Sequence, residues 1–354
     1  MKTPAAILVE QRRPLILDEV ELPPLGYGQV LVDIQVSRIC GSQIGEIDGV
    51  KGPDRHLPHL LGHEGGGVVL EVGPAVKHVR PGDRVVLHWR PGTGIECSPP
   101  VYRWRGGHAN AGCITTFNRY GVISENRLTR VPSDTEFDVC ALLADTLTTG
   151  FGLIHNEARV RIGEAVVVIG CGGIGLGVVL GAKLAGAHPI IAVDLHDHKL
   201  QKAAQQGATH TVNSAKEDFS AAVLRILEGA SPDVVIDGTG NALVLEKAFL
   251  LASSTGRCVI FGVMPHDCKL AINTLPLHFG KVLTGSHGGA SSPSEDIPRY
   301  LRMMQAGRFD PRQFISHRVR LPQINEAIAR MRSGEVIHAV IDFRSDSAEG
   351  APAQ

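Results

Sequence analysis

Four side chains in this sequence are of the chemical types that make up a metal site. Cys40 offers a thiolate, His63 an imidazole, and Glu64 and Asp145 offer carboxylates. Zinc binds such mixed sulfur, nitrogen and oxygen ligands, and a catalytic zinc keeps about three protein ligands and one open position. Any one of these residues alone would more often be a packed or surface side chain. In combination they predict one catalytic zinc whose open position receives a substrate oxygen.

A glycine-rich turn gives the second chemical signal. The segment GCGGIG, residues 170–175, follows an apolar stretch at 165–169 and precedes a helix-like stretch at 174–185. Glycines at this spacing permit a tight turn and a close approach to a pyrophosphate, whose charge meets the amides of a helix N-terminus. The segment therefore predicts a dinucleotide site formed by Gly170, Gly172, Gly173, Ile174 and Gly175.

An acidic residue follows at the distance that NAD-binding domains use. Asp194 comes after a second strand-like stretch, 189–193, about 20 residues beyond Gly175, where a carboxylate accepts hydrogen bonds from the adenosine ribose. The same carboxylate would repel a 2′-phosphate, so NAD is favoured over NADP. Lys199 either covers the adenosine end or is an ordinary surface lysine. S-adenosylmethionine binds similar folds, but the metal ligands disfavour it here.

Length and composition limit the remaining function classes. At 354 residues the chain is long enough for two domains of about 100 to 200 residues each. Hydrophobic residues make up 43% and charged residues 20%, which supports folded cores. Lys and Arg number 35 against 36 Asp and Glu, so no net charge attracts nucleic acid or an anionic membrane. We expect neither as a partner.

The cysteines and the N-terminus indicate a reducing compartment. Seven scattered cysteines do not form a disulfide pattern, and without a CxxC pair we expect no structural zinc of the four-cysteine type. The N-terminus has no signal-peptide core, and no apolar stretch of about 20 residues could span a bilayer. We expect a cytoplasmic protein.

The pattern along the chain predicts an α/β protein of two domains. Short Val- and Ile-rich runs separated by Gly and Pro indicate a mainly β domain, whereas alternating strands and helices indicate a doubly wound parallel sheet of the Rossmann type. Later stretches, helix-like at 294–306 and 321–333 and strand-like at 339–343, are expected to rejoin the first domain, and 345–354 to fray. The predicted domains are 1–148 with 289–354, and 149–288.

Gly62-His63-Glu64-Gly65 closely resembles the GHE signature of the zinc-dependent medium-chain dehydrogenase/reductase family, the alcohol dehydrogenases. Further matches are Cys40-Gly41-Ser42, the segment 81–85 (PGDRV) and the segment 148–150 (TTG). The resemblance covers nearly the whole chain and implies a GroES-like fold for the mainly β domain. It also implies that Cys40, His63 and a third residue before the Rossmann domain hold zinc, with Glu64 as an optional or exchanging ligand.

The third ligand is identified from the same resemblance. The segment 143–150 (LADTLTTG) is similar to the branch of the family that uses aspartate, which points to Asp145, with Cys140 as the alternative. Ser42 matches the hydroxyl that passes the alcohol proton outward, unless it only forms a turn.

The sequence also departs from better-known members. Gln43 stands where an aspartate is usual, and Gly45 where a histidine continues the proton relay. His338 stands where an arginine often reaches the cofactor phosphates, which predicts weaker or more pH-dependent cofactor binding.

The substrate is less well determined than the chemistry. Trp89 lies where an aromatic residue lines the substrate pocket in the family. Arg90, Arg103 and Arg105 are candidates for holding a polar or anionic substrate such as a phosphorylated polyol or sugar, or belong to a solvated loop. A simple alcohol, a polyol and a sugar intermediate all stay open.

The leading prediction is an NAD-linked zinc alcohol dehydrogenase that interconverts a secondary alcohol and its ketone, because zinc favours the ionised alcohol and polarises the carbonyl. Two alternatives stay open: a metal-free NAD(P)H reductase of the same fold, and a noncatalytic NAD(H)-sensing protein that binds a partner. Family members imply a homodimer or homotetramer.

Overall fold

In the computed structural model, which describes residues 1–344, the chain forms two compact units. Unit 1 comprises Met1–Gly49, Pro53–Asp145 and the chain from Ser292 onward, and unit 2 comprises Val50–Gly52 and Thr146–Ser291. The boundaries expected from the sequence, after residues 148 and 288, each lie three residues from these divisions. The expected frayed tail, 345–354, lies outside the described residues.

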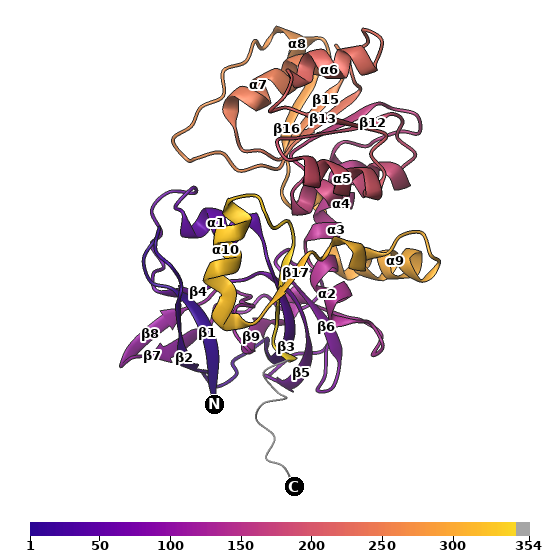
Figure 1. Cartoon of the computed structure of the whole chain (residues 1–354). Coiled ribbons are helices and arrows are strands. Elements are labelled where there is room, and N and C mark those ends of the chain that lie inside the picture. The colour runs from indigo at the N-terminus through magenta and orange to yellow at the C-terminus, as the bar shows by residue number, and fades with distance from the viewer. Residues whose placement is uncertain (345–354) are drawn as a thin grey trace. The chain divides into compact units, whose positions relative to one another are not determined.

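Unit 1 contains two β systems (Figure 1). The smaller is a closed barrel, whose strands in order are β1 (Lys2–Leu8), β2 (Ile16–Glu21), β7 (Val101–Trp104), β8 (Gly107–Asn110) and β4 (His59–Leu60). The larger is a seven-stranded sheet with the order β10 (Leu128–Arg130), β6 (Arg84–His88), β5 (Glu64–Val72), β3 (Gln29–Ile39), β18 (Ala339–Asp342) and β17 (His317–Val319), and with β9 (Tyr120–Ser124) paired to β3.

The long strand β3 is the axis of this sheet. Its even-numbered apolar residues, Val30, Val32, Ile34 and Val36, are fully buried, as the period of two in a strand requires. The neighbouring strand β5 has three glycines, residues 65–67, directly after its first residue. A Cβ on Gly66 would lie 2.6 Å from the Cβ of Cys140, so only glycine lets α2 (Phe137–Leu143) pack directly on β5. This close packing brings the end of α2 to the sheet.

The C-terminal segment returns to unit 1, as the sequence predicted. Strand β18 pairs antiparallel with β3 and parallel with β17, and so completes the sheet. The remaining helical segments of the unit are α1 (Gly41–Ile47), α9 (Pro293–Gln305), α10 (Ile324–Arg332) and the short 3-10 turns η1 (Glu125–Arg127), η4 (Pro311–Phe314) and η5 (Leu321–Gln323).

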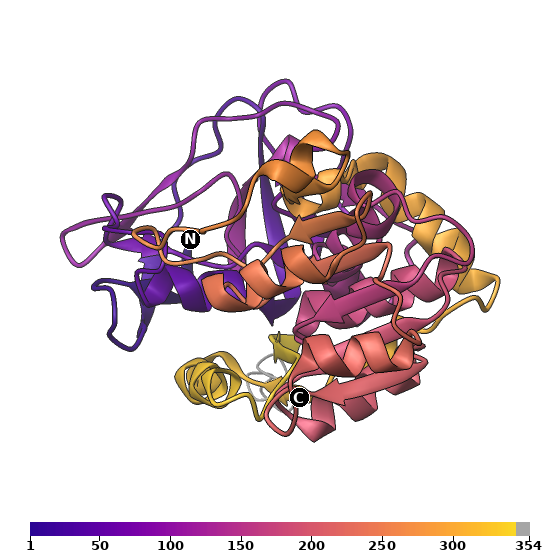
Figure 2. The same ribbon diagram turned by 90° about the horizontal axis from the view of Figure 1, so that it is seen from above.

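Unit 2 is a parallel sheet in the order β13 (His210–Asn213), β12 (Ile190–Asp194), β11 (Val166–Ile169), β14 (Val234–Asp237), β15 (Arg257–Ile260) and β16 (Val282–Gly285). Helices connect the strands and cover the sheet (Figure 2). The helical segments of the unit are α3 (Thr146–Gly152), the π-helical turn η2 (Leu153–Glu157), α4 (Gly173–Leu184), α5 (Asp197–Gln206), α6 (Phe219–Ile226), α7 (Ala242–Leu251), α8 (Leu275–His278) and the turn η3 (Gly288–Ala290).

The strand order reverses between β11 and β14. In open α/β sheets the carboxyl ends of the strands at such a reversal border the crevice where ligands bind. The turn after β11 and the end of β14 are therefore the places where unit 2 should carry a cofactor site.

One helical run, Phe137–Glu157, is long and apolar enough to cross a bilayer by length and composition. Of its apolar window, 94% is buried inside the protein, as is usual for a core helix of a globular fold.

Candidate metal and dinucleotide sites

The four predicted ligands come together in unit 1. Cys40 directly follows β3, His63 precedes β5, Glu64 begins β5, and Asp145 lies just after α2. One ligand atom from each of these residues lies within 4.8 Å of all the others. Because α2 packs on β5 through its glycines, Asp145 reaches residues that are up to 105 positions earlier in the chain.

The spacing of three of these groups fits a tetrahedral metal. The Oδ2 atom of Asp145 lies 3.5 Å from Nε2 of His63 and 3.7 Å from Sγ of Cys40. Metal bonds of about 2.0 to 2.3 Å at a tetrahedral angle separate neighbouring ligand atoms by about 3.3 to 3.8 Å. The Nε2 atom of His63 is buried and has no hydrogen-bond partner in residues 1–344, so its lone pair is available to a cation.

The charges that the cluster can carry also favour a cation. Cys40, Glu64 and Asp145 can each carry a negative charge, and Arg38 is the positive side chain that contacts them. Burial raises the pKa of the Cys40 thiol, and it raises the pKa of the Glu64 carboxyl well above its ordinary value. A divalent cation would neutralise the two charges that Arg38 leaves uncompensated. Cys40, His63 and Asp145 therefore fit zinc in number, type and spacing.

Two neighbouring side chains orient the ligands. The indole Nε1 of Trp89 donates to Oδ1 of Asp145 at 2.9 Å, which leaves Oδ2 directed at the cluster. Gln43 accepts the backbone N–H of Cys40 at 2.9 Å and contacts Nδ1 of His63 through its amide nitrogen. Such outer contacts fix ring and carboxylate orientation at metal sites. The sequence placed Trp89 in a substrate pocket; the structure shows it bonded to a predicted ligand.

Arg38 is a residue at this site that sequence reasoning missed. Its Nη1 donates to Oε1 of Glu64 at 2.6 Å, and its Nε donates to Nδ1 of His338 at 2.8 Å. The available signal was a basic residue at the end of a strand, two positions before Cys40, where the period of two puts both side chains on the same side of the chain. The structure places His338 against Arg38, and its predicted effect on cofactor binding stays a prediction.

Two other predicted residues have defined positions near Cys40. The backbone amide of Ser42 donates to the Cys40 sulfur, while the role of its hydroxyl as a proton carrier stays a prediction. Cys140, the alternative third ligand, is buried in α2 against Gly66, and burial raises the pKa of its thiol to about 12. Among the described residues it is Asp145, and not Cys140, that joins the cluster.

The three predicted substrate arginines are not brought together. Arg90 lies over the ring of Trp89, 5.9 Å from its centroid. Arg103 and Arg105 belong to the small barrel, where they pair with Glu21 at 3.7 Å and Asp18 at 2.7 Å. The side chain of Arg103 is 82% exposed. These positions give Arg103 and Arg105 carboxylate partners on β2 and do not link them to the metal cluster.

The glycine-rich turn of unit 2 has the geometry of a pyrophosphate site. Gly170 ends the strand with a φ of 92°, a conformation that favours glycine. A Cβ on Gly175 would lie 1.9 Å from the carbonyl oxygen of Gly170, so the turn can close only over glycine. A Cβ on Gly172, at the N-terminus of α4, would meet no atom within 4 Å. This open space lies where the helix amides would meet a phosphate.

Asp194 ends β12 and is bonded to the same turn. It accepts the backbone N–H of Cys171 at 2.8 Å and that of His196 at 3.0 Å. Lys199 follows in the first turn of α5. The roles of Asp194 and Lys199 toward the adenosine half of a dinucleotide stay predictions, but their position at the strand ends is the one that such roles require.

A second carboxylate at this edge was not foreseen. Asp237 ends β14 and is fully buried, with its Oδ1 accepting the hydroxyl of Thr239 at 2.9 Å. Its Oδ2 has no hydrogen-bond partner within the described part of the chain. Burial raises the pKa of Asp237 to about 6. A Cβ on Gly170 would lie 3.4 Å from the backbone of Gly238, so this loop borders the glycine-rich turn.

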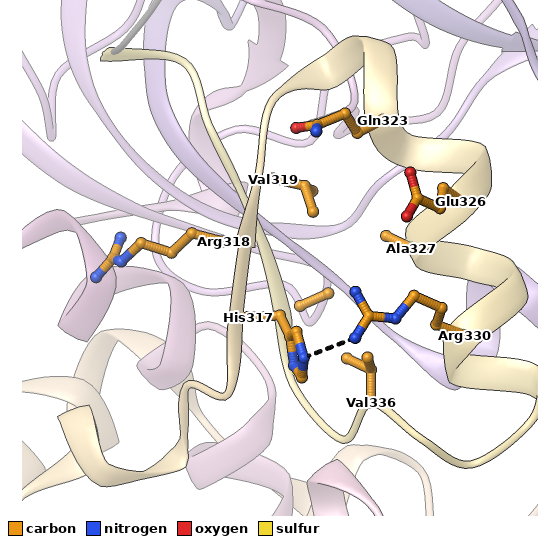
Figure 3. Close-up of a pocket in the computed structure, with 9 residues that line it drawn as sticks. His317, Arg318, Val319, Gln323, Glu326, Ala327, Arg330 and Val336 are labelled. Carbon is orange, nitrogen blue, oxygen red and sulfur yellow. Dashed lines mark hydrogen bonds between the residues drawn. The ribbon is translucent and has the colours of Figure 1, made fainter.

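A separate hollow of about 120 Å³ lies in unit 1 between β17 and α10 (Figure 3). His317 and Arg330 face one another across it, with Nε2 and Nη2 3.1 Å apart. Arg330 also pairs with Glu335 at 2.6 Å, and Arg318 pairs with Asp138 at 2.8 Å. Since these charged side chains already pair within the protein, nothing in the hollow indicates a ligand site.

Comparison with known proteins identifies the family of both units. The alcohol dehydrogenase GroES-like domain family matches residues 26–133, and the zinc-binding dehydrogenase family matches residues 173–306. The chain is 32% identical to alcohol dehydrogenase class-3 of Cereibacter sphaeroides, over 97% of this chain and all of that protein. It is 30% identical to S-(hydroxymethyl)glutathione dehydrogenase of Paracoccus denitrificans, over 96% of this chain and all of that protein.

The similar solved structures are also alcohol dehydrogenases. The crystal structure of benzyl alcohol dehydrogenase from Acinetobacter calcoaceticus matches with a TM-score of 0.87 and 26% identity, over 97% of this chain and 99% of that one. A zinc-binding alcohol dehydrogenase domain protein from Burkholderia ambifaria matches with the same TM-score, identity and coverage.

A GroES-like domain combined with a Rossmann domain defines the class of medium-chain dehydrogenases/reductases, and the predicted fold class is confirmed. Within that class, the chain belongs to the zinc-dependent alcohol dehydrogenase family, as the GHE motif predicted. Its relatives establish it as an NAD-dependent oxidoreductase.

Proposed function

We propose that this chain interconverts an alcohol and its carbonyl compound, with NAD as the hydride carrier and one zinc ion held by Cys40, His63 and Asp145. Two observations carry the proposal: Oδ2 of Asp145 lies 3.7 Å from Sγ of Cys40 and 3.5 Å from Nε2 of His63, and this nitrogen is buried without a hydrogen-bond partner among residues 1–344. When bound, zinc would supply the Lewis acidity that favours the ionised form of an alcohol near neutral pH.

The protein's own groups prepare the site for this reaction. Trp89 holds Asp145 so that one carboxylate oxygen faces the cluster, and Gln43 fixes the plane of the His63 ring. The amide of Ser42 favours the thiolate of Cys40, and we assign to its hydroxyl the removal of the alcohol proton. In unit 2 the glycine-rich turn binds the pyrophosphate, and Asp194 binds the adenosine ribose and excludes NADP.

The substrate is the least defined part of the proposal. The sequence favours a secondary alcohol, while the names of two similar proteins refer to benzyl alcohol and a hydroxymethyl thiol adduct, in both of which the reacting carbinol is primary. Polyol, sugar-derived and phosphorylated substrates stay in the proposal because Arg90 lies against Trp89. The proposal includes a cytoplasmic homodimer or homotetramer, which cell fractionation and sedimentation would test.

The test combines metal analysis with an NAD-coupled screen of primary and secondary alcohols, polyols and their phosphates. We expect one zinc per chain, NAD-dependent turnover, and loss of both in Cys40→Ser and Asp145→Asn. Cys268→Ser, which changes an exposed cysteine of unit 2, is the matched control and should retain both. Cys140→Ala should also keep its metal, because its thiol lies outside the cluster.

Three outcomes separate the proposal from its alternatives. Turnover that survives complete removal of metal by a chelator would identify a metal-free reductase. Tight NADH binding without turnover on any substrate of the screen would identify a noncatalytic NAD(H)-sensing protein. Folded protein that neither contains zinc nor takes it up would refute the metal site itself.

A further inference from the structure

A buried guanidinium lies directly beside the proposed metal ligands. Arg38 is 1% exposed, and its two partners, Glu64 and His338, are both fully buried. The distances of 2.6 Å to Glu64 and 2.8 Å to His338 are those of direct hydrogen bonds. Because Nδ1 of His338 accepts from Arg38, the proton of the neutral imidazole is on Nε2, and this ring fixes the plane of the guanidinium.

The charges divide the site into two neutral groups. Zinc with the thiolate of Cys40 and the carboxylate of Asp145 sums to zero, and Arg38 with Glu64 also sums to zero. A buried carboxylate needs a positive partner, since an unpaired charge in the interior is strongly destabilising. Arg38 already provides that partner to Glu64. Glu64 therefore has no electrostatic need for the metal while Arg38 is in place.

The distances agree with this division. Oε1 of Glu64, the oxygen bonded to Arg38, lies 4.0 Å from Nε2 of His63, whereas the Oδ2 of Asp145 lies 3.5 Å from the same nitrogen. The Oε1 atom of Glu64 is thus farther from His63 than neighbouring ligand atoms of a tetrahedral site are from one another. Its second oxygen, Oε2, is buried and has no hydrogen-bond partner among residues 1–344.

We propose that Arg38 is a positioning residue that holds Glu64 outside the ligand set of the metal and so keeps the fourth position open for the substrate oxygen. This inference rests on the proposed function, because it requires the metal at Cys40, His63 and Asp145. Without Arg38, the nearest positive partner for Glu64 is the metal itself. Glu64 would then become the fourth ligand of the metal. The affinity of the site for the metal would rise, and the substrate oxygen could no longer bind.

The experiment measures the metal and not only activity. The parent and the Arg38→Met, Glu64→Gln and Arg38→Met/Glu64→Gln variants are stripped of metal and reloaded with zinc or with cobalt(II). Competition with a chromophoric chelator gives the zinc dissociation constant, and the cobalt absorption spectrum reports the number and type of ligands. Methionine is chosen because it removes the charge of Arg38 and keeps much of its length.

We expect Arg38→Met to bind zinc about tenfold or more tightly than the parent and to have a changed cobalt spectrum, because Glu64 becomes an added ligand; this change has the size usual for groups around metal ligands but the opposite sign to the usual loss of affinity. The double variant should return to the parent spectrum, because glutamine cannot replace the carboxylate as a ligand. A parent-like dissociation constant and spectrum in Arg38→Met would overturn the inference. So would a double variant that retains the spectrum of Arg38→Met.

Glu64→Gln keeps the inference testable if Arg38→Met does not fold. Since Glu64 is outside the ligand set of the parent, this variant should have the parent cobalt spectrum, and a spectrum that loses a ligand would contradict the inference. A parent protein that takes up no metal at all would instead refute the proposed function, so the two failures are distinguishable.

Discussion

The carboxyl group of Asp237 allows a quantitative prediction about the stability of unit 2. It is fully buried at the end of β14, and its Oδ2 lacks a hydrogen-bond partner in the described chain. Burial raises its pKa from 3.8 to about 6, against the opposing effect of the Thr239 hydrogen bonds. The folded state therefore disfavours the ionised form, and Asp237→Asn removes the ionisation while retaining an oxygen acceptor for Thr239.

The magnitude follows from the two pKa values. A difference of about two pH units corresponds to about 3 kcal/mol, at about 1.4 kcal/mol per unit. Because the folded pKa is the higher one, the folded state holds one more proton than the unfolded state between about pH 4 and pH 6, and stability falls as the pH rises through that window. Above about pH 6 the buried carboxylate is ionised, and the full free-energy cost of its burial lowers the stability of the folded state. We therefore expect Asp237→Asn to stabilise the protein by up to about 3 kcal/mol near pH 8 and by little near pH 4.

Urea denaturation at the two pH values measures this difference. All tryptophan and tyrosine residues of the chain lie in unit 1, so intrinsic fluorescence follows unit 1 and far-UV circular dichroism follows the helices of both units. Asp267→Asn, which changes an exposed carboxylate of unit 2, is the matched control and should have the parent stability at both pH values. The reasoning is refuted if Asp237→Asn changes the unfolding free energy by the same amount near pH 4 and near pH 8.

Three further predictions concern the sites. Trp89→Phe removes the hydrogen bond to Asp145 and should weaken zinc binding about tenfold or more, as chelator competition would measure; a raised KM with parent zinc affinity would instead support the sequence-based pocket role. Arg103→Ala and Arg105→Ala should leave kcat and KM unchanged, because both side chains pair with carboxylates of β2, and an increase in KM in either variant would restore the hypothesis of an anionic substrate. Asp194→Ala should raise the dissociation constant of NADH about ten- to hundredfold through the loss of charge-assisted hydrogen bonds, and parent-like binding in a fluorescence titration would count against its ribose role.

The elements of the fold were predictable where the sequence pattern is local. The helices predicted at 174–185 and 294–306 are α4 and α9, each displaced by one residue, and the strand predicted at 339–343 is β18, which ends one residue earlier. Period and turn residues determine such elements over short distances in the chain. The pairing of β18 with β3 was expected only in outline, since it joins residues about 300 positions apart.

The metal cluster was also largely predictable, because its residue types are specific and one pair of ligands is adjacent in the chain. The contacts that support the ligands were not. Trp89 and Asp145 are 56 positions apart, and Arg38 and His338 are 300 positions apart. No spacing rule relates such residues, because their distance depends on how separate strands pair.

The sequence by itself determined the chemistry of this protein: the ligand types, the glycine turn and the alternation of strands and helices, all of which follow from side-chain type and short-range geometry. Only the tertiary structure decided which groups surround that chemistry. In that structure Trp89 donates a hydrogen bond to a predicted ligand, Arg103 and Arg105 pair with carboxylates of β2, and Arg38 and Asp237 are buried beside the two candidate sites. The physical reason is that burial and charge pairing depend on the packing of segments that are distant in the chain. Burial and charge pairing in turn determine the pKa, and so the protonation state, of an ionisable group.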